Sequence, residues 1–239
     1  MSQALCDFFG CLRLPFDKSL PARDLFPSTA LRAFIQSLDP NLYLTAYISN
    51  PNLTVQSLFA HILTTFHVSA TFHPRGLGER LRATLAELSQ RGSQPILVVD
   101  EAHLLSHRLL HELRYWLNAD MDAATPFTLI LLGQPDLRKL LQIKNFEALD
   151  QRIQVRFHIQ PFDLAQSAAY IKHDLRVVGA ERFPFSDSFI HAAQQFSHGI
   201  PRQLNRVCVN GLLIGFAERK PILDETDARR AILELDRSS

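Results

Sequence analysis

Two adjacent acids, Asp100 and Glu101, follow an apolar run at residues 96–99. The run predicts a buried strand, because successive aliphatic residues leave no polar face for solvent. Acids at the carboxyl end of such a strand lie where open α/β sheets bind their ligands. There, Asp100 would bind Mg²⁺ and Glu101 would polarise an attacking water. The alternative interpretation is a strand whose last two acids only face solvent.

This pattern is typical of the Walker B strand of P-loop ATPases, but the phosphate loop that accompanies it is missing. That loop has the form G-x-x-x-x-G-K-[ST], and its backbone N–H groups and lysine bind the phosphates. The chain has nine glycines, and none of them precedes a lysine. The sequence therefore indicates nucleotide-binding ancestry more clearly than present activity.

Three further polar residues are candidates for the same site. Gln134 follows a predicted strand at 127–132 and would lie between the acids and a γ-phosphate, unless it is only a turn residue before proline. Arg152 precedes a short predicted strand at 155–159 and could reach a neighbouring subunit's phosphate as an arginine finger. Arg156 is the other candidate for that role, and solvated charge is the alternative for both.

Arg202 follows Gly199-Ile200-Pro201 at the predicted start of a helix. Proline is favoured in the first helical turn, whereas the helix dipole disfavours a cation there. This position favours a ligand-binding role for Arg202 over that of a surface arginine.

Two other motifs suggest different chemistry. His103, His107 and His111 recur every four residues and could share a helix face, but no fourth metal ligand has suitable spacing. Residues 100–103 also spell the DEAH box of RNA helicases, which need a P-loop upstream and a second RecA-like domain downstream. We rank both interpretations below a Walker B strand.

The composition is that of a globular protein. Hydrophobic residues make up 46% of the 239 residues and the net charge is +1, so charge gives no argument for a nucleic-acid or membrane partner. The three cysteines lack disulfide or zinc spacing. The start lacks a signal-peptide pattern, and no apolar run approaches the ~18 residues of a membrane span. We expect a cytoplasmic protein without membrane insertion.

The hydrophobic periodicity predicts an α/β domain followed by an all-α domain. Predicted strands lie at 42–49, 96–99, 127–132 and 155–159, and they alternate with predicted helices at 28–37, 54–66, 75–91 and 106–118. After Pro161 only helices are predicted, at 163–178, 186–196, 201–217 and 224–235. We expect an irregular arm at 1–27, a core with a parallel sheet at 28–160, and a helical domain at 161–239.

Taken together, the motifs resemble the AAA+ ATPases of the ExeA type, which are similar to the TniB- and IstB-like ATPase partners of transposases. The resemblance covers nearly the whole chain. Besides the residues above, it is carried by Phe8-Phe9-Gly10, Leu14-Pro15-Phe16, Ser49-Asn50-Pro51 and Tyr170-Ile171-Lys172-His173.

The resemblance implies a RecA-like AAA+ P-loop core, with a parallel sheet and helices on both faces, and a C-terminal helical lid. It implies ATP and Mg²⁺ as cofactors, and a homo-oligomeric ring or a ring of an intact paralogue. The partner would be a transposase or a secretion-system protein, with DNA left open. It implies that Asp100 binds the metal, Glu101 polarises water and Gln134 senses the γ-phosphate. Arg152 would act in trans, on the nucleotide of a neighbouring subunit. Arg202 would sense the nucleotide from the lid, and Ser28 would supply the P-loop hydroxyl.

The chain departs from this family in lacking the first strand and the P-loop before Ser28. We infer an internal deletion of very roughly 30–40 residues, about one helix–strand–loop unit; an error in the gene model is the alternative. The expected function is an ATPase of this type with impaired activity, coupling ATP hydrolysis to remodelling of a partner complex. The alternatives are a non-enzymatic binding module and a DExH-type helicase fragment.

Overall fold

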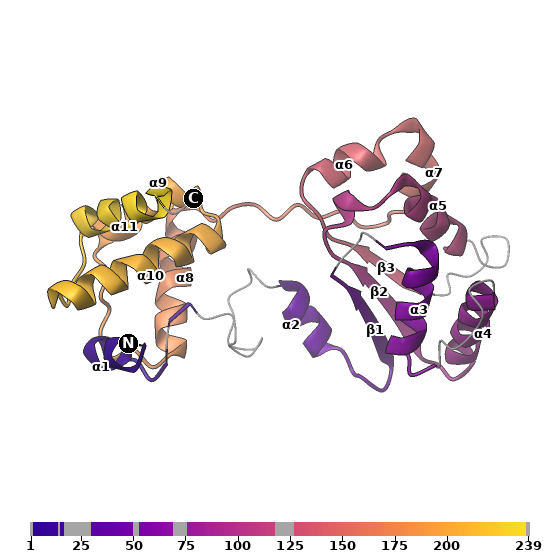
Figure 1. Cartoon of the computed structure of the whole chain (residues 1–239), viewed down its shortest axis with the longest axis horizontal. Coiled ribbons are helices and arrows are strands. Elements are labelled where there is room, and N and C mark those ends of the chain that lie inside the picture. Colours follow the sequence, from indigo (N-terminus) through magenta and orange to yellow (C-terminus); the bar gives the residue numbers. More distant parts are fainter. Residues whose placement is uncertain are drawn as a thin grey trace. The chain divides into compact units, whose positions relative to one another are not determined.

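The computed structural model describes residues 2–13, 15–16, 30–49, 53–68, 76–117 and 127–237. The chain divides into two compact units, one of Ser37–Phe157 and the other of Met1–Gln36 with His158–Ser239. Each unit has its own hydrophobic core. The first contains the sheet and the second is helical, as the labels in Figure 1 show.

The sheet unit is built on three parallel strands in the order β1-β2-β3. Their bounds are Tyr43–Ile48 for β1, Gln94–Val99 for β2 and Thr128–Leu131 for β3. The central strand is buried on both faces, since residues 96–99 are at most 4% exposed. The structure confirms three of the predicted strands and the parallel α/β class.

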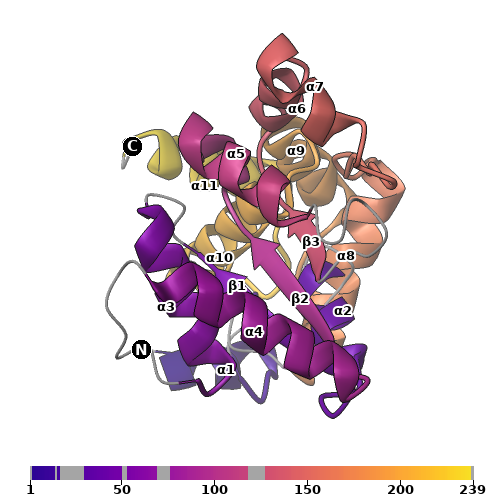
Figure 2. The same cartoon turned by 90° about the vertical axis from the view of Figure 1, so that its right-hand side faces the viewer.

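Helices surround this sheet and connect its strands. They are α3 (Val55–Thr65), α4 (Leu77–Gln90), η4 (Ala102–Leu104), α5 (His107–Trp116), α6 (Asp136–Leu141), η6 (Lys144–Phe146) and α7 (Glu147–Asp150). Thr54 caps α3 by accepting a hydrogen bond from the backbone N–H of Ser57 at 3.1 Å. Gly92, with φ +77°, follows the end of α4. Figure 2 shows α3 and α4 packed side by side over the strands.

The fourth predicted strand, at 155–159, is wrong. Residues 153–163 contain no helix or strand, and the three apolar side chains of the segment, Val155, Phe157 and Ile159, are 82%, 87% and 62% exposed. A strand needs a neighbour for its backbone hydrogen bonds, and the sheet provides none beside this segment.

The helical unit contains α1 (Ser2–Phe9), α8 (Leu164–Val177), α9 (Asp187–Ser197), α10 (Pro201–Glu218) and α11 (Glu225–Arg237). The last four confirm the helices predicted after Pro161. A further short helix, α2 (Ala30–Ser37), precedes β1, and the start predicted for it at residue 28 lies outside the described residues. No described helix is both long and apolar enough to cross a bilayer.

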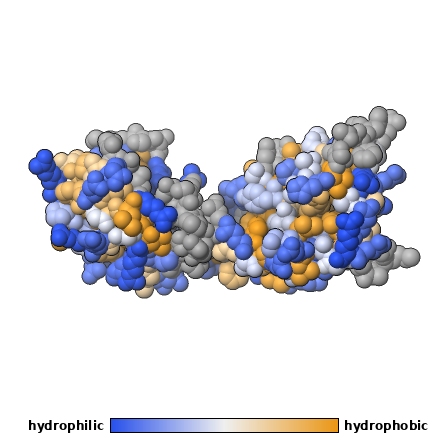
Figure 3. All heavy atoms as spheres, turned by 90° about the horizontal axis from the view of Figure 1, so that it is seen from below, coloured by the Kyte–Doolittle hydropathy of each residue, from blue (hydrophilic) through white to orange (hydrophobic). Residues whose placement is uncertain are grey.

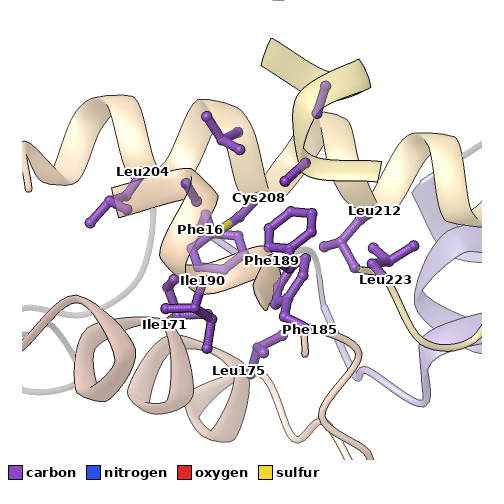
Figure 4. Close-up of a cluster of buried hydrophobic side chains, with 14 of the residues drawn as sticks. Phe16, Ile171, Leu175, Phe185, Phe189, Ile190, Leu204, Cys208, Leu212 and Leu223 are labelled. Carbon is purple, nitrogen blue, oxygen red and sulfur yellow. The ribbon is translucent and has the colours of Figure 1, made fainter. Parts of the chain in front are cut away.

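The prediction of an irregular N-terminal arm is wrong for its first residues, because residues 2–9 form α1. Leu5, Cys6 and Phe9 lie on one face of this helix and are buried in the core of the C-terminal helices. Farther along the arm, the backbone N–H of Leu12 donates to the carbonyl of Val178 at 2.7 Å. Figure 4 shows Phe16 inside this core near Phe189 and Ile190 of α9. The arm is therefore part of the helical unit.

Candidate nucleotide site

The candidate site lies where β2 and β3 end. The backbone N–H of Leu132 donates to the carbonyl of Val99 at 2.9 Å, and that of Ala102 donates to the carbonyl of Leu132 at 2.7 Å. These bonds tie the turn after β2 to the turn after β3. Asp100, Glu101 and Gln134 are thereby brought to one edge of the sheet, as the sequence predicts for the carboxyl ends of parallel strands.

Asp100 is hydrogen-bonded through both carboxylate oxygens. The hydroxyl of Tyr47, near the end of β1, donates to Oδ2 at 2.5 Å. The backbone N–H of Glu101 donates to Oδ1 at 2.8 Å. Each carboxylate oxygen has a second lone pair, so Asp100 could still bind a cation beside these two hydrogen bonds.

Glu101 is held in an unusual backbone conformation. Its φ of 51° and ψ of 34° lie in the left-handed region, which few residues other than glycine occupy. Strain of this kind persists where the surrounding structure enforces it and is concentrated at functional sites. The side chain of Glu101 is half exposed, and its Oε2 lies 3.6 Å from Nε2 of His103.

His103 links Glu101 to Gln134. The backbone N–H of Gln134 donates to Nδ1 of His103 at 3.4 Å. A neutral imidazole that accepts at Nδ1 carries its proton on Nε2, the nitrogen that faces Glu101. The close approach depends on Gly133, because a Cβ there would lie 3.2 Å from the backbone nitrogen of His103 and 3.1 Å from Leu137. The Gln134 side chain itself is exposed.

The other predicted site residues belong to other segments of the chain. Arg152 follows α7 and is half buried, whereas Arg156 donates to the backbone carbonyl of Asp150 at 2.6 Å. Arg202 is exposed in the first turn of α10, in the other unit. Ser28 lies outside the described residues.

The Gly-Ile-Pro motif before Arg202 has a structural explanation. The backbone N–H of Phe162 donates to the carbonyl of Gly199 at 2.9 Å. A Cβ on Gly199, whose φ is +73°, would lie 1.9 Å from the carbonyl oxygen of Phe162. Only glycine fits this contact, and Pro201 then starts α10.

No sequence pattern indicates Tyr47 or assigns His103 to this site. Tyr47 is hydrogen-bonded to Asp100 across 53 residues of sequence, so only the pairing of β1 with β2 could reveal it. The four-residue spacing groups His103 with His107 and His111 as candidate metal ligands. In the structure the rings of His107 and His111 pack on Phe146 at 5.1 Å and 5.0 Å, and no group of metal-ligating side chains is found in the described part of the chain.

Comparison with known proteins agrees with this geometry. A family model described as an AAA domain matches residues 28–141. General secretion pathway protein A of Aeromonas hydrophila is 31% identical over 195 residues, which are 80% of this chain and 35% of that protein. This chain thus spans about a third of the length of that relative.

Solved structures show the same fold. The ORC2 protein of Aeropyrum pernix, solved as ADPNP-ADP complexes, superposes with a TM-score of 0.63 at 14% identity, over 87% of this chain and 58% of that one. Drosophila ORC bound to DNA gives 0.60 at 16% identity, over 87% and 50%.

A parallel sheet with acids at its carboxyl edge, followed by a helical unit, defines a AAA+ fold. The chain belongs to the AAA+ family. Within that family it is of the ExeA type, the type of general secretion pathway protein A.

Proposed function

We propose that this chain is a AAA+ subunit of the ExeA type that retains the hydrolytic side of the nucleotide site but lacks the phosphate-binding side. Its own ATP hydrolysis is then weak or absent. The convergence of Asp100, Glu101 and Gln134 supports the retained side. The absence of any Gly-Lys pair from the sequence supports the loss, because the loop N–H groups and lysine provide most of the phosphate affinity in P-loop enzymes.

In an intact site of this type, Asp100 would bind Mg²⁺ and Glu101 would polarise the attacking water. Gln134 would contact the γ-phosphate, and Arg152 would act on a neighbouring subunit's nucleotide. Arg202 would sense the nucleotide from the lid, and Ser28 would supply the hydroxyl that binds the metal. The described residues do not fit a complete ATP–Mg²⁺ site. Mg²⁺ is normally held by one or two carboxylates together with the substrate phosphates. Here the chain lacks the phosphate loop that would hold those phosphates in place.

The missing phosphate loop is the observation that carries this proposal, because no glycine of the sequence precedes a lysine. The hydrogen bonds to Asp100 are compatible with metal binding, since ligating carboxylates are themselves hydrogen-bonded. Here one oxygen accepts from the tyrosine hydroxyl and the other from the next backbone N–H. Each oxygen keeps a lone pair for a cation, but a nucleotide would reach Asp100 without help from a phosphate loop.

The partners follow from the relatives. Similarity to a general secretion pathway protein supports a secretion-system partner, and ring assembly with itself or with an intact paralogue would supply complete sites. One relative in fold was solved bound to DNA, which keeps DNA and a transposase as alternatives. In this proposal nucleotide turnover in the assembled ring remodels the partner complex, in the cytoplasm.

The second candidate is a non-enzymatic binding module. It is favoured by the missing phosphate loop, which leaves the site without its main source of phosphate affinity. The helicase alternative lacks such support, because the described residues after Pro161 form helices α8–α11 and no second sheet.

Binding of a fluorescent ATP analogue with Mg²⁺ tests the proposal. The natural chain would be compared with a version in which the phosphate-loop segment of the secretion relative is inserted before Ser28, each with and without Asp100→Ala. Asp236→Ala, at an exposed acid of α11, is the matched control. We expect only the restored chain to bind, and Asp100→Ala to weaken it. Equal binding by the natural chain, lost in Asp100→Ala, would refute the proposal.

A further inference from the structure

Two of the cysteines, Cys6 and Cys11, lie on either side of the turn that ends α1. Their spacing in the sequence indicates no disulfide, but the backbone folds back between them. The N–H of Cys11 donates to the carbonyl of Cys6 at 2.8 Å, and the N–H of Gly10 donates to the carbonyl of Asp7 at 3.4 Å. With Gly10 at a φ of +68°, these two bonds form a Schellman motif. In this motif the side chains at the positions of Cys6 and Cys11 commonly pack on each other.

Both thiols lie in the core of the helical unit. Cys6 is 3% exposed and Cys11 is 5% exposed. The Cys11 thiol is directed back at the end of the helix, because its Sγ lies 3.8 Å from the carbonyl oxygen of Phe9. Burial raises the pKa of Cys11 to about 11, and the neighbouring Cys6 thiol adds to this rise. The two sulfurs are therefore within electrostatic reach of each other.

The turn between the cysteines attaches the arm to the loop after α8. The carbonyl of Gly10 accepts from the N–H of Glu181 at 3.4 Å, and the N–H of Leu12 donates to the carbonyl of Val178 at 2.7 Å. Beside the cysteines, Phe8 and Leu12 are 37% and 83% exposed. Figure 3 looks onto the side of the helical unit where α1 lies in Figure 1, and it shows apolar side chains between polar ones there. The thiols thus lie under a short terminal helix, and a local opening of α1 exposes them.

We propose that Cys6 and Cys11 form a disulfide when the chain meets an oxidising small-molecule disulfide, and that this bond locks the arm onto the helical unit. One cysteine thiolate attacks a sulfur of the small molecule and releases one thiol from it. The other cysteine then attacks the mixed disulfide and releases the second thiol. The two cysteines give up two protons and two electrons, and the small molecule takes up both as it becomes two thiols.

Burial makes this reaction conditional on an oxidant. The thiolate is the nucleophile, and a thiol with a pKa of about 11 is almost fully protonated at neutral pH. In a reducing compartment, disulfides are usually transient and serve to sense oxidation. Once formed, the bond closes a ring across the turn at Gly10 and removes conformations from the unfolded arm, so it stabilises the folded arm. The proposal does not depend on the nucleotide site.

The first test treats the full chain with glutathione disulfide and maps the product by mass spectrometry. Trypsin leaves Cys6 and Cys11 in one peptide, residues 1–13, and Cys208 in another, residues 207–219. We expect the oxidised peptide 1–13 to be about 2 Da lighter than the reduced peptide, the mass of two hydrogen atoms. An unmodified chain, mixed disulfides with glutathione alone, or a bond to Cys208 would overturn the proposal.

A second test asks whether the turn brings the two thiols together. Gly10→Ala keeps both cysteines, and its Cβ would meet Glu181 at an ordinary 3.6 Å, but its backbone is strained at a φ of +68°. The equilibrium constant for disulfide formation against glutathione should therefore fall about 3–10-fold. Gly92→Ala, at a φ of +77° in the other unit, is the matched control and should leave the constant unchanged. Equal constants for the natural chain and Gly10→Ala would overturn the role of the turn.

A third test measures the locking of the arm. The helical transition, followed by circular dichroism, should move up by at least ~3 °C when the natural chain is oxidised. The Trp116 fluorescence of the sheet unit should melt at the same temperature in both forms. Cys6→Ala with Cys11→Ala is the control, and its melting temperature should not respond to glutathione disulfide. Oxidised and reduced natural chains with the same helical transition would overturn the proposal, and that comparison needs no variant.

Discussion

The hydroxyl of Tyr47 lies 2.5 Å from Oδ2 of Asp100 and joins the end of β1 to the turn after β2. The tyrosine holds the carboxylate that, by resemblance, would bind the metal. It also anchors the helix that follows β1, because its backbone carbonyl lies 3.1 Å from Nε2 of His61 in α3. Tyr47 thus ties Asp100 to both β1 and α3.

Replacement of Tyr47 tests this hydrogen bond. Tyr47→Phe keeps the ring and removes the donor, so it should cost about 0.5–1 kcal/mol of the free energy of unfolding, a small value because the pair is partly solvated. The loss is measured by urea unfolding with the fluorescence of Trp116, the single tryptophan, which lies in the sheet unit. Tyr115→Phe, at an exposed tyrosine, should have no effect. A Tyr47→Phe variant as stable as the natural chain would contradict the role of this bond.

The left-handed backbone of Glu101 predicts a stabilising substitution. Glu101→Gly should raise the free energy of unfolding by up to about 1 kcal/mol, because glycine adopts this conformation without steric strain. Glu101→Ala removes the same carboxylate but keeps the strain, and it should bring no gain. The difference between the urea unfolding midpoints of the two variants measures the contribution of the backbone strain to stability. Equal midpoints would show that the turn is not strained.

Asp174 predicts a pH dependence of stability in the helical unit. The side chain is buried in α8, and burial raises its pKa from 3.8 to about 6, with His173 acting in the opposite direction. The hydroxyl of the neighbouring Tyr170 is bonded to Asn205. Between the two pKa values the folded state holds a proton that the unfolded state has released, so stability is greatest below pH 3.8 and falls as the pH rises to about 6.

The expected loss across this window is about 3 kcal/mol at most. Asp174→Asn removes the titrating carboxyl and with it this loss of stability. The variant should therefore be more stable than the natural chain at pH 7.5, and this position should no longer make its stability depend on pH. Thermal melts followed by circular dichroism between pH 4 and 7.5 measure the difference. The exposed Asp236→Asn is the control. A natural chain and an Asp174→Asn variant with parallel pH profiles would contradict the assignment.

The N-terminal arm packs in the helical unit, so a mutation in the arm should destabilise the helical unit. Phe9 is 5% exposed and lies near Gly215 of α10, whereas its neighbour Phe8 is 37% exposed. Phe9→Ala should cost about 3–4 kcal/mol and Phe8→Ala much less. The loss should appear in the helical transition by circular dichroism and leave the Trp116 fluorescence transition unchanged. A shift in Trp116 fluorescence instead would place the arm with the sheet unit.

The sequence alone determined the elements and the chemistry at the end of β2. Periodicity located β1, β2 and β3 and the helices after Pro161, because a strong apolar pattern needs only neighbouring residues to be read. The parallel class also followed from the alternation of strands and helices. The parallel class placed Asp100, Glu101 and Gln134 at one edge of the sheet, since strands that run in the same direction end on the same side.

Only the tertiary structure decided the contacts between distant segments. The apolar pattern predicted β3 correctly but failed at residues 155–159, because a strand exists only where a neighbour completes its hydrogen bonds. Residues 2–9 became a helix because the C-terminal helices cover their apolar face. Tyr47 joined Asp100 through strand pairing. In each case the residues that decide the structure are far apart in the sequence, so the local sequence pattern does not reveal their contact.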